Sequence, residues 1–331
     1  MNTVTEALQG KTLFITGATG LIGRNLVGFL NKANETLVKP IKIVALVRDI
    51  ERAKIQFNNI NNIEYVIGNV IDKIDVNLEI DYIIHAASQT SSKMFVNEPV
   101  QTIETAFQGT KNILELGKEK NVKSIVYLST MEVYGAPITD EKIDENHETN
   151  INTMTVRSSY PESKRICETL CCAYHSEYGL PVKVLRLTQT FGCGVPYNDS
   201  RVFAEFARCV IEEKDIVLHT KGETKRNYLD VLDAVEAILV VLLRGENGQA
   251  YNAANEDTYC SIFEMAKMVV EKCAENKINV LVKMEDEKKF GYAPILKMNL
   301  DTSKLRALGW EAKRGLESMF SLMIEDMKRN R

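Results

Sequence analysis

Residues 16–23 read T-G-A-T-G-L-I-G and directly follow the apolar run T-L-F-I-T at 12–16, which predicts a β-strand. Glycines in such a turn let the backbone approach a pyrophosphate, and the amino end of the following helix stabilises its charge. A helix is predicted near 21–32, so the motif has the strand–turn–helix context that dinucleotide binding requires. The expected cofactor contacts from this loop are Gly17, Thr19, Gly20, Leu21, Ile22 and Gly23.

Short apolar runs alternate with helical patterns through the first half of the chain. Alternation of this kind specifies an α/β fold, a Rossmann-type doubly wound parallel sheet with right-handed crossovers. Further strands are predicted at 41–47, 64–67, 81–85, 125–128 and 182–187, and further helices from about 50, at 99–120 and at 161–178.

Beyond residue 188 the alternation loosens, and Gly, Pro and Asn become more frequent, which indicates a smaller C-terminal α/β lobe for the substrate. We expect residues 1–187 to form the dinucleotide-binding domain, with 230–257 returning to it. Residues 188–229 and 258–331 are expected to form the substrate lobe.

Composition narrows the possible partners. The chain has 331 residues, 26% of them charged, and a formal charge of −4, so neither a nucleic acid nor a membrane is expected as a partner. The amino terminus lacks the pattern of a signal peptide, and the longest apolar run, 237–243, is too short to span a bilayer. The seven cysteines contain no C-x-x-C pair, so no metal site and no disulfide framework is expected, which favours a cytoplasmic protein.

The spacing G-x-x-G-x-x-G is typical of short-chain dehydrogenases. From Thr16 to D-T-S-K-L-R-A-L-G-W at 301–310, the chain resembles the extended short-chain dehydrogenase/reductase family, specifically its nucleotide-sugar epimerases, dehydratases and decarboxylases. The resemblance implies NAD or NADP as the cofactor and a nucleoside-diphosphate sugar as the substrate. It also implies a homodimer, in which the helices at 99–120 and 161–178 pair with those of a second copy.

The second predicted strand ends at Arg48 and Asp49, where the residue type selects the cofactor. An acidic residue there hydrogen-bonds the adenosine ribose, whereas an arginine accommodates a 2′-phosphate. Arg48 therefore favours NADP, although Asp49 reaches the ribose if the register shifts by one. Other expected cofactor contacts, carried over from the resemblance, are Asn69, Val70, Ala86, Ala87 and Ser88.

Tyr160 and Lys164 lie four residues apart and hence on one face of a predicted helix. A free phenol has a pKa near 10, and a neighbouring ammonium and the positive nicotinamide lower that pKa toward neutrality. The phenolate then takes the proton of a substrate hydroxyl. The resemblance implies that Thr130 hydrogen-bonds the same substrate oxygen. Ser129 is the alternative source of this hydroxyl, and both residues are expected to contact the substrate.

Dehydratases of the family show T-D-E where this chain reads T-M-E at 130–132. A thioether cannot donate a proton, so Met131 disfavours elimination of water. Glu132 is kept, and the resemblance implies that it acts at C5 of the sugar. An N-cap or an ordinary ion pair is the alternative role for Glu132.

The resemblance also implies substrate contacts in the second lobe. Gln189 replaces an Asn that contacts the substrate diphosphate, and Arg226 suits the same anion by forked donation. Arg201 is a second candidate, with a solvated charge as its alternative, and Tyr292 is expected to stack or cap nearby.

Together these features predict an enzyme that oxidises a nucleotide sugar at C4, epimerises or decarboxylates the 4-keto intermediate at C5, and reduces it again. An NADPH-dependent 4-keto-sugar reductase is the rival enzyme. A non-catalytic NADP-sensing protein is the rival from another class.

Overall fold

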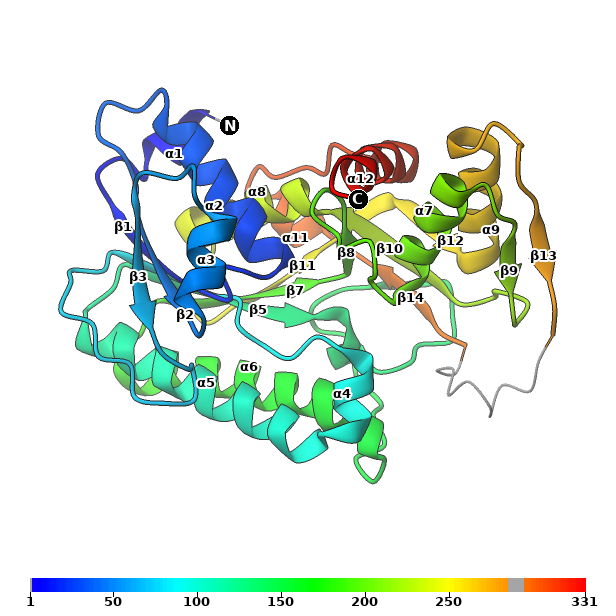
Figure 1. The fold of residues 1–331 in the computed structure, drawn as a ribbon. Helices are drawn as coiled ribbons and strands as arrows, with labels where there is room; N and C mark the ends of the chain where they lie inside the picture. Colours follow the sequence, from blue (N-terminus) through cyan, green and yellow to red (C-terminus); the bar gives the residue numbers. More distant parts are fainter. Residues whose placement is uncertain (1, 285–294) are drawn as a thin grey trace.

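The computed structural model describes residues 2–284 and 295–331. Within them a seven-stranded parallel sheet has the order β3-β2-β1-β4-β5-β7-β11, which confirms the predicted Rossmann-type fold class (Figure 1). Its strands are β1 Thr12–Thr16, β2 Lys42–Val47, β3 Ile63–Ile67, β4 Tyr82–His85, β5 Ser124–Thr130, β7 Val182–Leu187 and β11 Ala250–Ala253.

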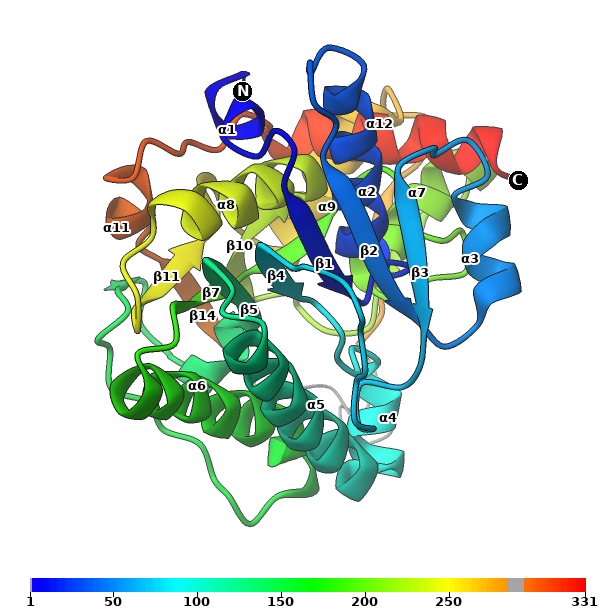
Figure 2. The same ribbon diagram turned by 90° about the vertical axis from the view of Figure 1, so that its left-hand side faces the viewer.

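Helices cover both faces of this parallel sheet, which is why its central strands are buried on both sides. In the two views of Figures 1 and 2, α2 (Leu21–Asn34) and α8 (Val231–Arg244) lie on one face. On the other face, α5 (Pro99–Glu119) packs beside α6 (Ser159–Tyr178). Parallel strands all end at the same edge, so the loops after β1, β4 and β5 meet there.

A second, mixed sheet has β10 (Lys225–Asp230) at its centre, with β12, β14 and β8 as its neighbours. Its apolar cluster includes Phe191, Phe203 and Phe320, and the Phe191 ring contacts the other two. The other elements of this part are β6 Lys142–Ile143, β8 Gln189–Phe191, α7 Val202–Glu212, β9 Ile216–Leu218, β12 Asn255–Ser261, α9 Ile262–Met268, η3 Val269–Cys273, β13 Val280–Val282, β14 Lys297–Leu300 and α12 Leu316–Arg329.

Short elements complete the described chain: α1 Asn2–Glu6, α3 Ile50–Gln56, α4 Ser92–Asn97, η1 Met131–Tyr134, η2 Val156–Ser158 and α11 Ser303–Arg306. Leu305 and Trp310 belong to the apolar core between the parallel sheet and α8. The division of the chain into two lobes at the residue limits given above stays a prediction. No helix in the described part of the chain combines the length and apolarity needed to cross a bilayer.

Candidate active site

The loop after β1 is shaped by glycines that no other residue can replace without displacement. Gly17 has a φ of +69°, and a Cβ there would lie 2.7 Å from the backbone carbonyl carbon and oxygen of Ala86. A Cβ on Gly23 would lie 2.1 Å from the Gly17 oxygen. The loop therefore packs directly on the backbone after β4, and α2 packs directly on the loop.

The amino end of α2 is suited to an anion. Its N-cap, Gly20, has an extended backbone and provides no side-chain cap, so the first N–H groups of the helix are free for a ligand. Thr19 lies in the same turn and accepts a 3.4 Å hydrogen bond at its carbonyl from Gln56. Leu21 packs against the aromatic cluster of the mixed sheet and Ile22 against the core of the parallel sheet. These features fit the pyrophosphate of a dinucleotide.

The segment after β4 is held by a buried histidine. His85 Nδ1 lies 2.7 Å from the Thr16 hydroxyl and its Nε2 lies 3.3 Å from Thr110, while Thr16 Oγ1 also accepts from the Ala87 N–H. Burial, with a contribution from Lys164, lowers the pKa of His85 to about 3, so the ring is neutral and joins β1 to β4 and α5. Ala87 and Ser88 are half-buried beside it, and the Ser88 hydroxyl donates to the Gln89 carbonyl.

Arg48 is exposed at the end of β2, and no hydrogen bond or ion pair to its side chain occurs among the described residues. Asp49 next to it caps α3 by accepting from the Arg52 N–H at 3.0 Å. Asn69 caps a turn after β3 by accepting from the Ile71 N–H. Val70 is buried, and a Cβ on Gly109 of α5 would lie 2.9 Å from its side chain.

Thr130, Tyr160 and Lys164 come together where β5 ends and α6 begins. The Thr130 hydroxyl lies beside the Tyr160 phenol and lowers the pKa of that phenol. Lys164 is fully buried one helical turn beyond, donates from Nζ to the Leu128 carbonyl at 2.8 Å, and lies 6.0 Å from the Tyr160 ring centroid. A phenol, a hydroxyl and an ammonium thus lie near one another at the carboxyl edge of the parallel sheet.

The protein alone does not acidify this phenol. Burial raises the pKa of Tyr160, the Glu132 carboxylate raises it further, and the Thr130 hydrogen bond and Arg157 oppose the rise. Burial lowers the pKa of Lys164 to about 8, so part of its positive charge is lost at mildly alkaline pH. A positive charge from outside these side chains, such as an oxidised nicotinamide, would favour the phenolate.

Glu132 makes an ion pair with Arg157, whose Nη2 donates to Oε2 at 2.7 Å. Met131 does not face this pair: its side chain is buried, and its sulfur accepts from the Thr188 hydroxyl at 3.3 Å. Ser129 is also turned away, because its hydroxyl donates to Glu168, which pairs with Arg186. The hydroxyl beside Tyr160 is therefore that of Thr130.

In the mixed sheet, Gln189 of β8 and Arg226 of β10 are brought together, with Arg226 Nη1 3.5 Å from Gln189 Oε1. Within the described residues, Arg226 Nε is buried without a hydrogen-bond partner, which suits an arginine that binds a ligand anion. Arg201 is instead engaged by Asp199 at 2.6 Å and lies over the Phe203 ring. Tyr292 lies outside the described residues.

The sequence did not predict two side chains of the site, Arg157 and Phe95. Arg157 pairs with Glu132, and Phe95 stacks on the Tyr160 ring with centroids 4.1 Å apart and planes 8° apart. The position of Arg157, three residues before Tyr160, was the available signal, since a short turn before a helix keeps its residues close to the first helical turn.

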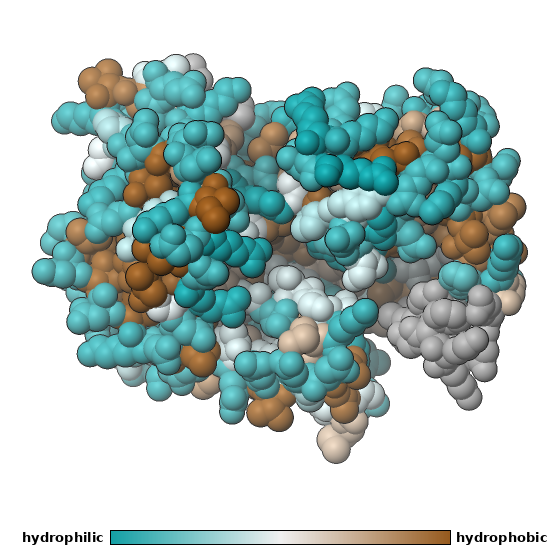
Figure 3. All heavy atoms as spheres, in the orientation of Figure 1, coloured by the Kyte–Doolittle hydropathy of each residue, from teal (hydrophilic) through white to brown (hydrophobic). Residues whose placement is uncertain are grey.

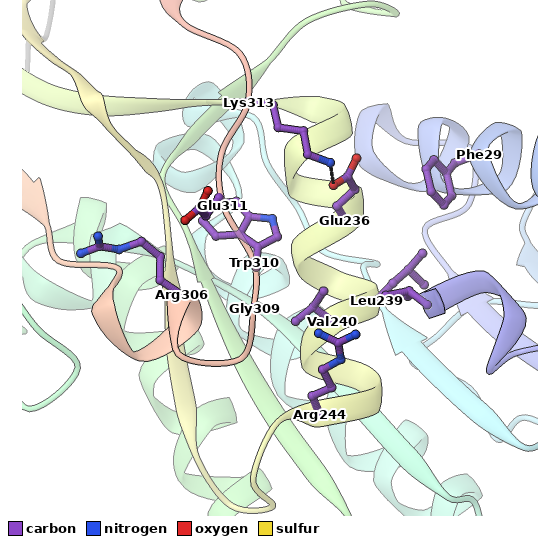
Figure 4. Close-up of a pocket in the computed structure, with 11 residues that line it drawn as sticks. Phe29, Glu236, Leu239, Val240, Arg244, Arg306, Gly309, Trp310, Glu311 and Lys313 are labelled. Atoms are coloured by element: carbon purple, nitrogen blue, oxygen red, sulfur yellow. Dashed lines mark hydrogen bonds and ion pairs between the residues drawn. The ribbon is translucent and has the colours of Figure 1, made fainter. Parts of the chain in front are cut away.

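Figure 3 shows the surface hollowed in the middle of the molecule, between the part that carries β1–β3 and the part that carries α7 and β9. A different cavity of about 370 Å³ lies by α8, on the face of the parallel sheet opposite α6 (Figure 4). Lys313 and Glu236 face each other beside it, and its wall includes Phe29, Leu239, Arg244 and Trp310. This cavity is separate from the Tyr160 site.

The phosphate loop after β1 and the tyrosine–lysine pair of α6 define a dinucleotide-dependent enzyme with a Rossmann fold. The model of the NAD dependent epimerase/dehydratase family matches residues 13–254, and the chain belongs to this family. It is an enzyme of the epimerase, dehydratase and decarboxylase type, as its resemblance to extended short-chain dehydrogenases predicts.

UDP-glucuronic acid decarboxylase 2 from Arabidopsis thaliana is 30% identical over 97% of this chain and 69% of its own length. UDP-glucuronic acid decarboxylase 4 from the same plant is 31% identical over 95% of this chain and 68% of its own length.

Solved structures share the fold. UDP-N-acetylglucosamine 4-epimerase from Methanobrevibacter ruminantium, in complex with UDP-N-acetylmuramic acid, has a TM-score of 0.82 at 20% identity, covering 98% of this chain and 100% of its own. UDP-glucose 4-epimerase from Thermotoga maritima, with UDP-glucose, has a TM-score of 0.80 at 22% identity, covering 96% of this chain and 99% of its own.

Proposed function

We propose that this enzyme converts a nucleoside-diphosphate sugar through a 4-keto intermediate, with epimerisation or decarboxylation at C5 favoured over 4,6-dehydration. The observation that carries the proposal is the meeting of Thr130, Tyr160 and Lys164 at the end of β5. The relatives named UDP-glucuronic acid decarboxylases support a nucleotide sugar as the substrate and make UDP-glucuronate the first compound to test.

In this proposal the C4 hydroxyl of the sugar lies between Thr130 and Tyr160. A nicotinamide dinucleotide, held by the loop after β1, would supply the group that takes up a hydride from C4 and gives it back. The Tyr160 phenolate accepts the hydroxyl proton, Thr130 hydrogen-bonds the same oxygen, and Lys164 holds a positive charge behind the phenol. The proton returns from Tyr160 to O4 at the end, so neither base nor cofactor changes overall.

A ketone at C4 activates C5. With a carboxylate on C5, the C5–C6 bond breaks, CO₂ leaves, and the electron pair passes to the C4 oxygen as an enolate that regains a proton at C5. With a hydrogen on C5 and no carboxylate loss, that hydrogen leaves as a proton and returns. Glu132 is the side chain proposed to move the C5 proton. Because Met131 is buried away from the pair and holds no acidic proton, expulsion of a C6 hydroxyl lacks its acid.

We propose that the cofactor is NADP rather than NAD. Arg48 is exposed at the end of β2, where the adenosine ribose of a dinucleotide lies in this fold. The one carboxylate beside it, Asp49, is already used to cap α3. Fluorescence titration with NADPH and NADH tests this choice: Arg48→Gln should weaken NADPH binding roughly tenfold or more and leave NADH binding unchanged.

We also propose a homodimer formed through α5 and α6. Val100, Ile103 and Phe107 are exposed on one face of α5, and Ile166 is exposed on α6.

We propose a cytoplasmic location as well. All seven cysteines are free thiols, which favours a reducing compartment.

The experiment that tests the function is incubation of the purified protein with UDP-, CDP-, GDP- and dTDP-sugars, uronates included, followed by NMR of the products. The proposal predicts an altered sugar with no net consumption of cofactor. Stoichiometric consumption of NADPH with a 4-keto sugar would instead reveal the rival reductase. Binding of NADP with no turnover of any sugar would favour the sensor.

A further inference from the structure

The Tyr160 ring is covered by a layer of side chains from two other elements. Phe95 of α4 stacks on it, with ring centroids 4.1 Å apart, and the Arg157 guanidinium of η2 lies 4.9 Å from the Phe95 centroid. The Ser159 hydroxyl donates to the Phe95 carbonyl at 2.9 Å and so fixes this layer to the start of α6. Arg157 is therefore held in place by packing as well as by charge.

Arg157 also reaches Glu132, which lies two residues beyond Thr130. The guanidinium and the carboxylate are 2.7 Å apart, with 40% and 32% of the two side chains exposed. The Glu132 N–H donates to the Thr130 hydroxyl at 3.3 Å, so Glu132 is tied to the residue that lies beside Tyr160. The turn that carries Arg157 is pinned in its own right, because Ser158 Oγ donates to the Asn152 carbonyl at 2.7 Å.

The charged and titratable groups around Tyr160 come from four elements. Glu132 comes from η1, Arg157 from η2, Lys164 from α6 itself and Tyr127 from β5. The Glu132 charge raises the pKa of Tyr160, and the Arg157 charge lowers it. A carboxylate this close to a phenol opposes its ionisation unless a cation offsets it.

We propose that Arg157 is a positioning residue of this site, which fixes the Glu132 carboxylate beside Thr130 and offsets its negative charge so that Tyr160 can ionise next to it. This inference rests on the proposed function of Tyr160 as the base. Arg157 itself touches no reacting atom. It acts through Glu132, and the stack on Phe95 keeps it there while the substrate enters and leaves.

The test measures the titration midpoint of the Tyr160 phenol in the protein loaded with NADP⁺. NMR of tyrosine labelled with ¹³C at Cζ monitors the titration. The Tyr160 signal is the one missing from Tyr160→Phe. Arg157→Gln should raise its titration midpoint by about one pH unit, Arg157→Lys should restore most of the shift, and Glu132→Gln should lower the midpoint. In a protein that already carries Glu132→Gln, Arg157→Gln should shift the Tyr160 midpoint by less than half as much as it does in the wild type.

Arg165→Gln is the matched control, because Arg165 pairs with Glu162 at 3.0 Å with nearly the same exposure and does not contact Tyr160. It should leave the midpoint unchanged. An Arg157→Gln midpoint equal to that of the wild type, or an Arg157 effect as large without Glu132 as with it, overturns the inference. A wild-type phenol that does not titrate below about pH 10 contradicts the proposed function instead, since Tyr160 then has no access to its base form.

Discussion

Tyr160 is a buried phenol whose surroundings in the protein alone favour its neutral form. The sequence predicted the pairing with Lys164 from spacing and the hydroxyl of Thr130 from family resemblance, and both side chains lie beside it. From the sequence, the lysine and a positive nicotinamide were expected together to lower the pKa of this phenol. Lys164 Nζ donates to the Leu128 carbonyl and does not shift the pKa of Tyr160, so the proposal relies on the positive cofactor for this effect.

Replacement of the phenol tests this assignment. Tyr160→Phe should reduce kcat by roughly 10²- to 10⁴-fold while UDP-sugar binding changes little, because only proton transfer is lost. Product NMR and isothermal titration calorimetry measure the two effects. Tyr174→Phe, which removes a hydroxyl from the same helix that bonds Glu115, should keep full activity. Equal activity in Tyr160→Phe and the wild type would remove Tyr160 from the chemistry.

Lys164 makes a prediction about stability. Burial lowers its pKa from 10.5 to about 8, so the unfolded chain holds the proton more tightly than the folded one between those values. The free energy of unfolding should therefore rise with pH across this window through this group, with the full penalty present below about pH 8.

Lys164→Met removes the penalty, so the variant should be inactive yet more stable than the wild type near neutral pH, by up to roughly 3 kcal/mol. Its advantage should shrink as the pH approaches 10.5. Urea unfolding of both proteins at several pH values measures this difference. An advantage that grows with pH would show that Lys164 is held as a stable cation.

The ion pair between Glu132 and Arg157 could not be predicted from the sequence. Both roles considered for Glu132, base or ion pair, used only its own position in the chain. Arg157 lies in η2, 25 residues after Glu132. A local sequence pattern does not indicate that this turn folds back beside the end of β5. The family resemblance favoured Thr130 over Ser129, and strand alternation turns the Ser129 hydroxyl toward Glu168 and the Thr130 hydroxyl toward Tyr160.

At the scale of elements, continuous apolar runs bounded by turns were predictable. The runs at 12–16, 41–47 and 182–187 match β1, β2 and β7 to within a residue, because buried parallel strands need apolar side chains on both faces. The short strands of the mixed sheet were not predicted. β6 has two residues and β8 three, and β10 begins with the polar residues Lys225 and Arg226, so neither run length nor alternation identifies them.

Helix α2 offers a comparison of two glycines. Gly23→Ala should destabilise the protein by about 1–3 kcal/mol and abolish dinucleotide binding, because its Cβ would meet the Gly17 and Ala18 backbone. Gly28→Ala, at an exposed position of the same helix with nothing within 4 Å, should stabilise it by roughly 0.5–1 kcal/mol and leave binding intact. Thermal unfolding and NADPH fluorescence measure both effects. Dinucleotide binding that survives Gly23→Ala would argue against the phosphate loop.

At the scale of the whole molecule, the start of α2 is joined to the segment after β8, and that segment is joined to α12. Arg24 of α2 donates to the Gly194 carbonyl and Asn25 to the Cys193 carbonyl, while the Gly194 N–H donates to Asp326 of α12. The sequence indicated two lobes from the loosening of the pattern after residue 188. It could not indicate these ties, because they join residues more than a hundred positions apart.

The exposed apolar face of α5 makes a prediction about assembly. Ile103→Glu, at a position 44% exposed, should convert the proposed dimer into a monomer at micromolar concentration, because a carboxylate would be buried without a partner in the interface. Val38→Glu, at a position 91% exposed outside these helices, is the control and should remain dimeric. Light scattering after size-exclusion chromatography measures both. A monomeric wild-type protein would refute the proposed dimer.

The most direct test of the central claim is turnover of a sugar nucleotide in D₂O by the protein loaded with NADP⁺, with the product examined by NMR. Oxidation and reduction by one bound cofactor predicts that the original hydrogen remains at C4 while solvent deuterium enters at C5. Deuterium at C4, or a product without solvent deuterium at C5 after complete turnover, would contradict a reaction through a 4-keto intermediate altered at C5.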